Sequence, residues 1–346
     1  MLQFSEYVSL GHPDKVADYI SQYLLDRYME RDPNTRYAVE VQIKGHRAVL
    51  GGEVSSAVKF SPRELNGFVC DAVNEIGYTR AYQDKWGAEN TICADDINIS
   101  GYISQQSPDI AQGLDGWGDQ GIFFGMATTN RMTCGMPYDH SLAKELCKAL
   151  FESGLGGLDI KTQVEAEGYT PSKIIVAIPL CPERGTATPE DVEAFIRARV
   201  ESKKPYEVIV NGTGRYVQHG TIADCGTTGR KLVVDFYGGN CHIGGGSPWT
   251  KDGSKADLTL NLVARRLAKN YASETGTDIY TRLACCIGKR DVDFCVTDRA
   301  GNIVSEGIMP LNPAEVIREL KLDTPCYASM CRWGLFGEYQ QDKPWE

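Results

Sequence analysis

Polar and apolar positions along the chain predict several capped helices. Residues 61–77 begin Ser-Pro-Arg-Glu, continue with apolar residues three and four positions apart, and end in glycine. A capping residue, proline and an acid before such a run are typical of the start of an amphipathic helix. The same order recurs at Thr188 and Asn312. The three predicted helices are therefore spaced by almost equal lengths of chain.

A second set of predicted helices has nearly the same spacing. Helices are expected to begin at Pro13, at Pro137 and close to Ser254. Runs rich in β-branched residues between the helices predict strands. They are Tyr37–Ile43, Ala48–Val54, Lys173–Leu180, Glu207–Val210 and Leu232–Tyr237. We interpret the pattern as an internal repeat of three α+β modules, over residues 1–106, 112–222 and 223–346. A chance recurrence of a common helix start is the alternative.

Composition and charge exclude several classes of protein. The chain has 346 residues, of which 42% are hydrophobic and 24% charged, as in ordinary folded domains. It has no apolar run long enough to cross a membrane and no secretory signal, so we expect a cytoplasmic protein with no membrane partner. The net charge of −10 opposes binding to nucleic acid. The twelve cysteines lack CxxC spacing, which favours reduced thiols over structural zinc.

Two common nucleotide-binding motifs are excluded by their context. Residues 116–121, Gly-Trp-Gly-Asp-Gln-Gly, have the dinucleotide fingerprint, but a polar loop precedes them and a strand-like run follows. That fingerprint needs a strand before it and a helix after it. Gly288-Lys289 is followed by arginine, so it does not complete a P-loop.

Cations and acids nevertheless gather in segments that suit a compact polyanion. Residues 11–15, Gly-His-Pro-Asp-Lys, begin a helix whose free N–H groups favour an anion. Their histidine and lysine add donors, and their aspartate offers a hard oxygen to Mg²⁺. Residues 224–231 end in Arg-Lys before a predicted strand, and the three glycines at 244–246 are followed by Lys251 and Lys255 and then by Asp257 at a predicted helix start. Each feature alone is also typical of a cap, a turn or a solvated helix face. Together they favour a nucleoside triphosphate with magnesium.

The order of these motifs resembles that of the S-adenosylmethionine synthetase (methionine adenosyltransferase) family. The motifs that carry the resemblance are Ser5-Glu6, Gly11–Lys15, Gly51–Glu53, Gln106–Ile110, Gly118–Gly121, Asp224–Gly226, Thr228–Lys231, Tyr237–Gly239 and Gly244–Lys255. The resemblance implies an α+β fold of three similar modules related by pseudo-threefold symmetry. It also implies transfer of the adenosyl group of ATP to the sulfur of L-methionine, followed by hydrolysis of the triphosphate to pyrophosphate and phosphate.

Individual roles follow from the same resemblance. His12 and Lys161 correspond to catalytic residues beside the departing triphosphate. The residues expected to bind ATP are His12, Asp119, Asp159, Lys161, Arg215, Tyr216, Asp224, Arg230, Lys231, Ser247 and Lys251. Those expected to bind methionine are Glu53, Gln106, Asp224 and Lys255. Asp14 and Asp257 are expected to hold two Mg²⁺ ions in each site, and Glu40 one K⁺. The family builds its active sites across a homodimer interface, so a homodimer or a dimer of dimers is expected.

Two other interpretations stay open. A non-catalytic relative would bind nucleotide as a regulatory subunit, but the expected catalytic and metal-binding residues are intact, which favours catalysis. A kinase or ligase of another fold would leave the order of the motifs unexplained.

The chain also departs from the family pattern in four places. Leu10, Thr250 and Leu258 replace an acid, a glycine and an arginine that are usual there. The segment from Ser107 to Gly118 is shorter than the gating loop of typical bacterial relatives, so we expect a more open site, with Trp117 restoring some apolar cover.

Overall fold

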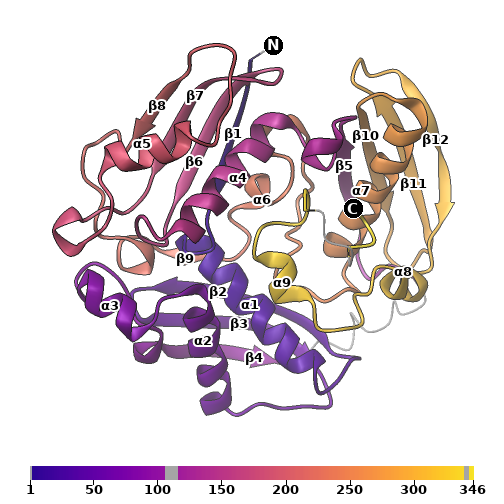
Figure 1. The fold of residues 1–346 in the computed structure, drawn as a ribbon. Coiled ribbons are helices and arrows are strands. Elements are labelled where there is room, and N and C mark those ends of the chain that lie inside the picture. The colour runs from indigo at the N-terminus through magenta and orange to yellow at the C-terminus, as the bar shows by residue number, and fades with distance from the viewer. Residues whose placement is uncertain (1, 106–115, 339–342) are drawn as a thin grey trace.

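Three four-stranded sheets surround the centre of the molecule in the computed structural model, which describes residues 2–105, 116–338 and 343–346 (Figure 1). The strands are β1 (Leu2–Val8), β2 (Arg36–Lys44), β3 (Arg47–Ser55), β4 (Asn98–Ser104), β5 (Gly121–Ala127), β6 (Lys161–Glu167), β7 (Thr170–Ala177), β8 (Glu207–Val210), β9 (Gly226–Thr227), β10 (Ile279–Cys285), β11 (Asp291–Asp298) and β12 (Ile303–Pro310). The helices are α1 (Pro13–Met29), α2 (Pro62–Ile76), α3 (Arg80–Trp86), α4 (Tyr138–Ser153), α5 (Pro189–Arg197), α6 (Leu232–Asp235), α7 (Ala256–Thr275), α8 (Pro313–Glu319) and α9 (Tyr327–Cys331). The fold is α+β, as the sequence predicts.

The three sheets share one plan. Their strand orders are β4-β3-β2-β9, β8-β7-β6-β1 and β12-β11-β10-β5. In each sheet two successive strands form a central antiparallel hairpin, and the fourth strand comes from a distant part of the chain. Thus β1 pairs with β6, β5 with β10 and β9 with β2. The sheets therefore exchange strands across the predicted boundaries of the modules, and the residue ranges of those modules stay a prediction.

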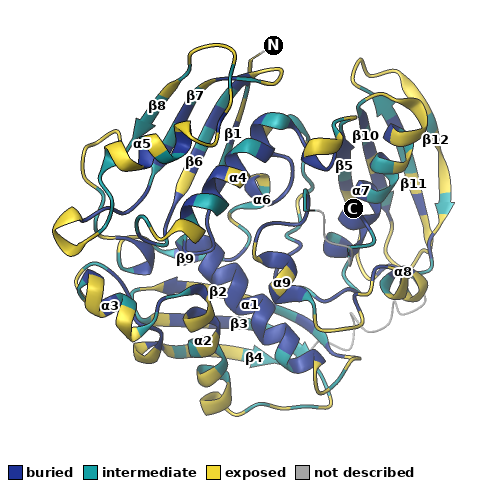
Figure 2. Ribbon diagram, viewed as in Figure 1, coloured by how far each residue is buried: buried dark blue, intermediate teal, exposed yellow. Residues whose placement is uncertain are grey.

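One long helix packs on each sheet, which accounts for the repeat in the sequence. Helix α1 contacts β2 and β9, α4 contacts β1 and β6, and α7 contacts β5 and β10. These are the three helices predicted from Pro13, Pro137 and the region of Ser254. Helix α1 is buried along almost its whole length (Figure 2), so its N-terminus is held rigidly at the centre of the molecule.

The predicted helix starts are confirmed by their caps. Ser61 and Glu64 form a complete capping box at the start of α2, and Thr188 and Asp191 form another at the start of α5. Asn312 caps α8 through its side chain. These caps pair the free N–H groups of the first turn, so local sequence is enough to fix where each helix begins.

One predicted strand is wrong. Residues 232–237 were expected to be extended, but Leu232–Asp235 form the single helical turn α6. The N–H groups of Asp235 and Phe236 donate to the carbonyls of Lys231 and Leu232 at 3.0 Å each. The carboxylate of Asp235 is also bound by two distant side chains, Lys15 and Trp249. These tertiary contacts override the β-propensity of the Val233-Val234 pair.

The sheet faces turned away from the helices keep large apolar side chains exposed. They include Phe4 on β1, Tyr102 on β4, and Ile122 and Ile308 on β5 and β12. Tyr102 is 77% exposed. A monomer rarely leaves so many large apolar groups in water on several sheets, so these faces are candidates for contact with another chain.

All twelve cysteines are free thiols. Among the described residues, no helix is both long and apolar enough to cross a membrane.

Candidate active site

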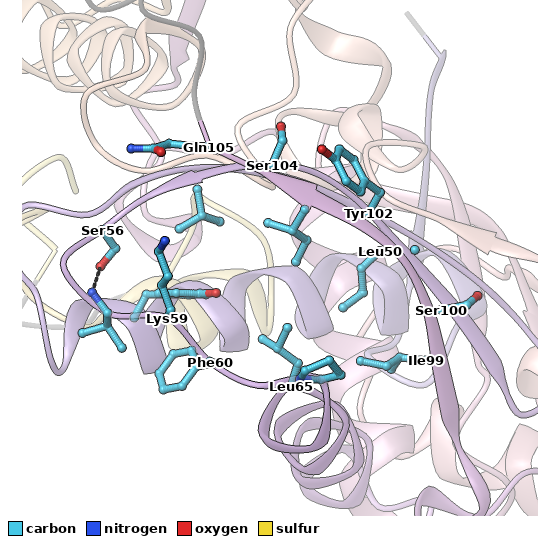
Figure 3. A pocket seen from close by; sticks show the side chains of 16 residues that line it. Leu50, Ser56, Lys59, Phe60, Leu65, Ile99, Ser100, Tyr102, Ser104 and Gln105 are labelled. Atoms are coloured by element: carbon cyan, nitrogen blue, oxygen red, sulfur yellow. Dashed lines mark hydrogen bonds between the residues drawn. The ribbon is translucent and has the colours of Figure 1, made fainter.

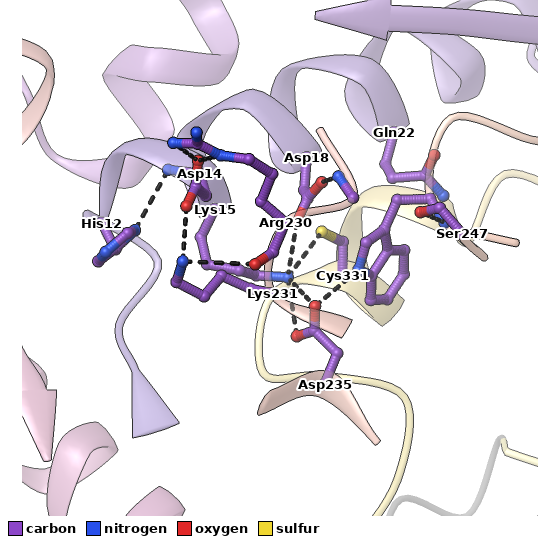
Figure 4. Close-up of polar contacts among 12 residues, drawn as sticks. His12, Asp14, Lys15, Asp18, Gln22, Arg230, Lys231, Asp235, Ser247 and Cys331 are labelled. Carbon is purple, nitrogen blue, oxygen red and sulfur yellow. Dashed lines mark hydrogen bonds and ion pairs between the residues drawn. The ribbon is translucent and has the colours of Figure 1, made fainter. Parts of the chain in front are cut away.

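The start of α1 brings the Gly-His-Pro-Asp-Lys segment against the loop that ends in Arg230 and Lys231 (Figure 4). His12 is the N-cap of the helix, and its Nδ1 accepts the N–H of Asp14 at 3.2 Å. The Asp14 carboxylate accepts from Nε of Arg230 at 2.9 Å and from Nζ of Lys231 at 2.6 Å. The N–H of Thr227 donates to the same carboxylate at 2.9 Å. One acid thus orients two cations at a helix N-terminus, an arrangement that favours a bound anion.

Burial and these cations set the charge of the two side chains. Burial opposes ionisation of Asp14, but the hydrogen bonds from Lys231 and Thr227 outweigh it and hold the pKa of Asp14 below its usual value. Burial, aided by Lys231, lowers the pKa of His12 to about 3. His12 is therefore neutral at physiological pH. Because a neutral imidazole has one N–H and Nδ1 acts as an acceptor, the proton is on Nε2, where it can be donated to a ligand.

We expect His12 not to titrate between pH 5 and 8 in the folded protein. Its lowered pKa means that an unfolded chain takes up a proton below about pH 6.5 while the folded chain does not. The contribution of His12 to stability is therefore lost progressively as the pH falls from there toward 3. NMR of protein labelled in the histidine rings, with the His12 signal identified by its absence from His12→Asn, measures this directly. A midpoint near 6.5 for that signal would contradict the buried, neutral histidine.

Lys15 does not serve as an anion donor, contrary to the expectation from the sequence. Its ammonium lies 2.8 Å from the carboxylate of Asp235 and 3.3 Å from that of Asp18, and it is almost completely buried. Nε1–H of Trp249 donates to Asp235 at 2.7 Å, and Asp18 accepts the N–H of Gly229 at 2.8 Å. This network below the helix start fixes α1 against the segments of Gly229 and Trp249 (Figure 4). The network thereby positions the cations of the site. In the sequence, the only local indication that Lys15 belongs to a buried ion pair is the aspartate three residues after it.

The segment around Asp159 forms another wall of this region. Burial raises the pKa of Asp159 to about 6, and its carboxylate accepts the N–H of Gly220 at 2.9 Å. The hydroxyl of Tyr216 donates to the carbonyl of Asp159 at 3.1 Å. Lys161 begins β6, is exposed, and contacts Glu6 at 3.2 Å. It is close enough to His12 to help lower the pKa of that histidine.

A second cluster forms around the start of α7. Lys251 donates a short hydrogen bond to Asp257, which lies in the first helical turn. A side chain at Gly246 would meet the Asp257 carboxylate at 2.0 Å, which explains why the triple-glycine segment can lie against this acid. Asp119 lies nearby, because both Asp119 and Asp257 raise the pKa of Cys285. Ala38 bridges to Lys251 and pairs with Glu53 on β3, which brings Glu53 to the same region.

Glu40 connects the two clusters. Its carboxylate accepts from the hydroxyl of Thr228 in a short hydrogen bond and from that of Thr250 at 3.0 Å. Thr228 follows the strand that binds Asp14, and Thr250 precedes Lys251. Thr250 has a φ of 73°, a conformation that favours the glycine usual in the family and is strained for a β-branched residue. Neither hydroxyl could be predicted from the sequence, because threonine alone carries no signal for an ion site.

The donor atoms agree with the expected ions. No group of three or more histidine, cysteine or acidic side chains suited to hold a metal ion occurs in the described part of the chain. Asp14 and Asp257 each offer one carboxylate beside cations that would face phosphate oxygens. Mg²⁺ typically uses one or two carboxylates and takes its other ligands from phosphates and water, so the residues fit it. The carboxylate and two hydroxyls at Glu40 are hard oxygen donors that fit a monovalent cation.

The other residues predicted from the sequence make fewer contacts with the two clusters. Ser247 lies beside Gly229, within reach of the first cluster. Asp224 lies close enough to influence His12. Arg215 affects the pKa of Glu183 on a neighbouring turn, and Lys255 is the N-cap of α7 without a side-chain capping bond. Gln106 lies outside the described residues, as does most of the segment 107–118.

Trp117 is described, and it does not cover the site as expected. Its ring is completely buried in the core. The backbone N–H of Trp117 donates to the carbonyl of Lys289 at 2.9 Å, and the backbone carbonyl of Trp117 accepts the N–H of Gly288 at 2.8 Å. It therefore anchors the chain before β5.

Comparison with known proteins identifies the family of this chain. Residues 1–108 match the family domain described as S-adenosylmethionine synthetase, N-terminal domain, and residues 218–346 match the C-terminal domain. An S-adenosylmethionine synthase of Clostridium tetani is 35% identical, in an alignment that covers 99% of this chain and 95% of the relative. The chain belongs to the S-adenosylmethionine synthetase family.

Other members support the assignment over the whole length. An S-adenosylmethionine synthase of Zymomonas mobilis is 34% identical over 99% of this chain and 95% of its own. The solved structure of an S-adenosylmethionine synthetase from Campylobacter jejuni, described as unusual, is 30% identical and superimposes with a TM-score of 0.88. It covers 99% of this chain and 96% of that chain. The departures at Leu10, Thr250 and Leu258 therefore occur within a complete family fold.

Proposed function

We propose that this protein is a methionine adenosyltransferase, which makes S-adenosylmethionine from ATP and L-methionine and hydrolyses the triphosphate to pyrophosphate and phosphate. The observation that carries the proposal is the Asp14 carboxylate held between Arg230 and Lys231, beside a neutral His12 at the start of α1. This is an environment for a triphosphate chain, and family membership over the full length specifies which reaction uses it.

The chemistry needs alignment and charge stabilisation. A thioether sulfur has no proton to lose, so no general base is required for its attack. A lone pair of sulfur forms the bond to C5′ of ATP, the C5′–O bond breaks, and its electron pair leaves with the triphosphate oxygen. We propose that Nε2–H of His12 donates to that oxygen, and that Lys161, Arg230 and Lys231 compensate the charge of the triphosphate.

The other predicted site residues are proposed to orient ATP and methionine. Tyr216 and Asp159 are proposed to hold the adenosine, with Asp119, Ser247 and Lys251 completing the ATP contacts. Glu53, Gln106, Asp224 and Lys255 are proposed for methionine, whose ammonium and carboxylate need partners of both signs. Arg215, next to Tyr216 in the chain, is proposed as a further ATP contact.

Asp14 and Asp257 would hold Mg²⁺ together with phosphate oxygens, and Glu40 with Thr228 and Thr250 would hold K⁺. The bound cations would supply additional charge neutralisation for the leaving group.

We also propose that a second copy completes each active site. Lys161, Glu40 and Glu53 all lie on sheet faces that no helix of their own chain covers. The exposed apolar groups described above lie on the same uncovered faces. A homodimer would bury these groups. It would also bring the Asp257 cluster of one chain opposite the Asp14 cluster of the other chain. A dimer of dimers and the cytoplasmic location stay predictions.

The direct test is to incubate the purified protein with ATP, methionine, Mg²⁺ and K⁺ and to look for the sulfonium product by mass spectrometry. Formation of S-adenosylmethionine supports the proposal. Nucleotide binding without product would favour the alternative, a non-catalytic regulatory relative.

We expect turnover to need a divalent cation and to be stimulated by K⁺ through Glu40. EDTA should abolish product formation, because Asp14 and Asp257 would lose the ion that joins them to the phosphates. Glu40→Gln should remove most of the K⁺ stimulation, since one formal charge leaves the proposed site. Thr250→Gly should raise the K⁺ concentration needed for half-maximal stimulation, because one oxygen ligand is lost.

The exposed acid Asp84 on α3 provides a control for these measurements, and Asp84→Asn should respond to both ions as the wild type does. Full activity in EDTA, or an unchanged K⁺ response in Glu40→Gln, would show that the ion sites are assigned wrongly.

A further inference from the structure

A cavity of about 500 Å³ lies at the open edge of the β4-β3-β2-β9 sheet (Figure 3). Its wall on the sheet side consists of Leu50 and Val54 from β3 and Ile99 and Ile103 from β4. Glu53 alternates with Leu50 and Val54 along β3 and so faces the other side of the sheet. The cavity is therefore separate from the proposed active site.

The opposite wall is aromatic and rigid. Phe60 packs edge to face on Tyr28 at a centroid distance of 4.6 Å and on Phe68 at 5.0 Å. Leu65, in the first turns of α2, continues this wall. A cavity of this volume, with these apolar walls and with serine, lysine and glutamine side chains in its lining, has the size and character of a small-molecule site.

The loop that closes the cavity is held in place by one acid. The Asp32 carboxylate accepts the N–H of Ala57 at 2.7 Å and the hydroxyl of Ser56 at 3.0 Å. The hydroxyl of Ser56 in turn accepts the N–H of Val58 at 3.2 Å. The cavity is therefore preformed, and a ligand would not have to order this loop before binding.

Charge at the cavity is unbalanced in favour of an anion. Figure 3 shows Lys59 extending from the loop between Phe60 and Gln105. Within the described residues, no ion-pair partner contacts Lys59. The nearby acids are already engaged, Asp32 by the loop and Glu64 by the capping box of α2. One positive charge beside the apolar walls of the cavity is complementary to a single negative charge on an apolar body.

We propose that this cavity is a second ligand site, which binds a small monocarboxylate with an apolar or aromatic body. The body occupies the space between Leu50, Ile103 and Phe60, and the carboxylate meets Lys59 at the mouth. This site is independent of the proposed catalytic function, because it uses none of the residues assigned to ATP, methionine or the ions.

Calorimetric titration of the intact protein with 1-naphthoate and with octanoate tests the proposal. We expect at least one of them to bind with a stoichiometry of one per chain. The neutral analogue 1-naphthalenemethanol should bind more weakly than 1-naphthoate. Lys59→Met should weaken carboxylate binding about two- to fivefold, the range expected for an exposed ion pair, and should leave the binding of the neutral analogue unchanged. Lys203→Met, at an exposed lysine elsewhere, is the matched control and should bind as the wild type does.

A cavity-filling variant makes the location testable. Val58→Trp places a large ring in the cavity from its loop side, and it should abolish binding while circular dichroism and the melting temperature show an intact fold. Should Val58→Trp unfold the protein, Val58→Phe provides the same test with a smaller ring. Absence of binding by both carboxylates to the wild type would overturn the proposal. Undiminished binding to a folded Val58 variant would also overturn it, because the ligand would then lie elsewhere.

Discussion

Replacing His12 by asparagine is expected to slow adenosyl transfer by a factor on the order of 10² to 10³. The neutral imidazole, fixed by the Asp14 N–H, offers its Nε2–H where charge develops on the departing oxygen. Asparagine can still cap the helix, so the fold should persist. Single-turnover measurement of S-adenosylmethionine formation separates this step from product release. ATP binding should weaken much less, since the lost interaction strengthens mainly as the triphosphate departs.

Lys161→Met extends the same test to the exposed cation on β6. It should slow the single-turnover step by a comparable factor, with little change in thermal stability because the Lys161 ammonium is largely exposed. A wild-type single-turnover rate in either variant would refute the catalytic role of that residue. Lys203→Met, at an exposed lysine between α5 and β8, is the matched control and should keep the wild-type rate.

Lys15→Met is expected to lower the free energy of unfolding by about 3–5 kcal/mol, the cost of removing one partner from a buried ion pair. Burial alone would lower the pKa of Lys15, but Asp235 raises it, so the ammonium is charged in the folded state. Its removal leaves Asp235 and Asp18 buried without their common cation. Urea denaturation followed by circular dichroism measures the effect.

Two further variants separate this structural role from catalysis. Lys15→Met combined with Asp235→Asn should recover part of the loss, because one of the two uncompensated acids is then neutral. Lys161→Met should show the opposite pattern, with lost activity and a normal unfolding midpoint. A Lys15→Met protein as stable as the wild type would mean that the network does not fix the helix start.

The sequence predicted best those features that are formed by residues close together in the chain. The starts of α2, α5 and α8 could be predicted because each cap is formed by side chains within a few residues. The repeat of α1, α4 and α7 was visible for the same reason. The helical turn in residues 232–237 could not be predicted, because it depends on contacts of Asp235 with two other segments. Lys15 is distant in the chain, and Trp249 comes from a later loop.

The candidate site shows a similar division. Resemblance to the family named the residues, and the structure gathers many of them in two clusters. The sequence could not distinguish the role of Lys15 from that of Lys231, because each is a lysine in a short motif that also contains an aspartate. Only their surroundings separate them, one in the core and one facing the open region at Asp14. From the sequence, Thr250 is only a departure from the glycine usual in the family. The structure adds that its backbone is strained and that its hydroxyl donates to Glu40.

The exchange of strands among the three sheets governs how the chain can fold during synthesis. Strand β1 leaves the ribosome first, yet its partner β6 begins only at Lys161. At 5–20 residues per second, β1 waits on the order of ten seconds for that partner. The β4-β3-β2-β9 sheet likewise stays incomplete until β9 is made, and β5 stays unpaired until β10 is made. The sheets completed by β9 and by β8 can therefore close only after strands of a later sheet have begun to emerge. A nascent chain with unpaired strand edges for this long is a natural client for chaperones. A chain stopped after residue 222 would leave β5 without its partner β10 and the edge of β2 without β9, and it should aggregate.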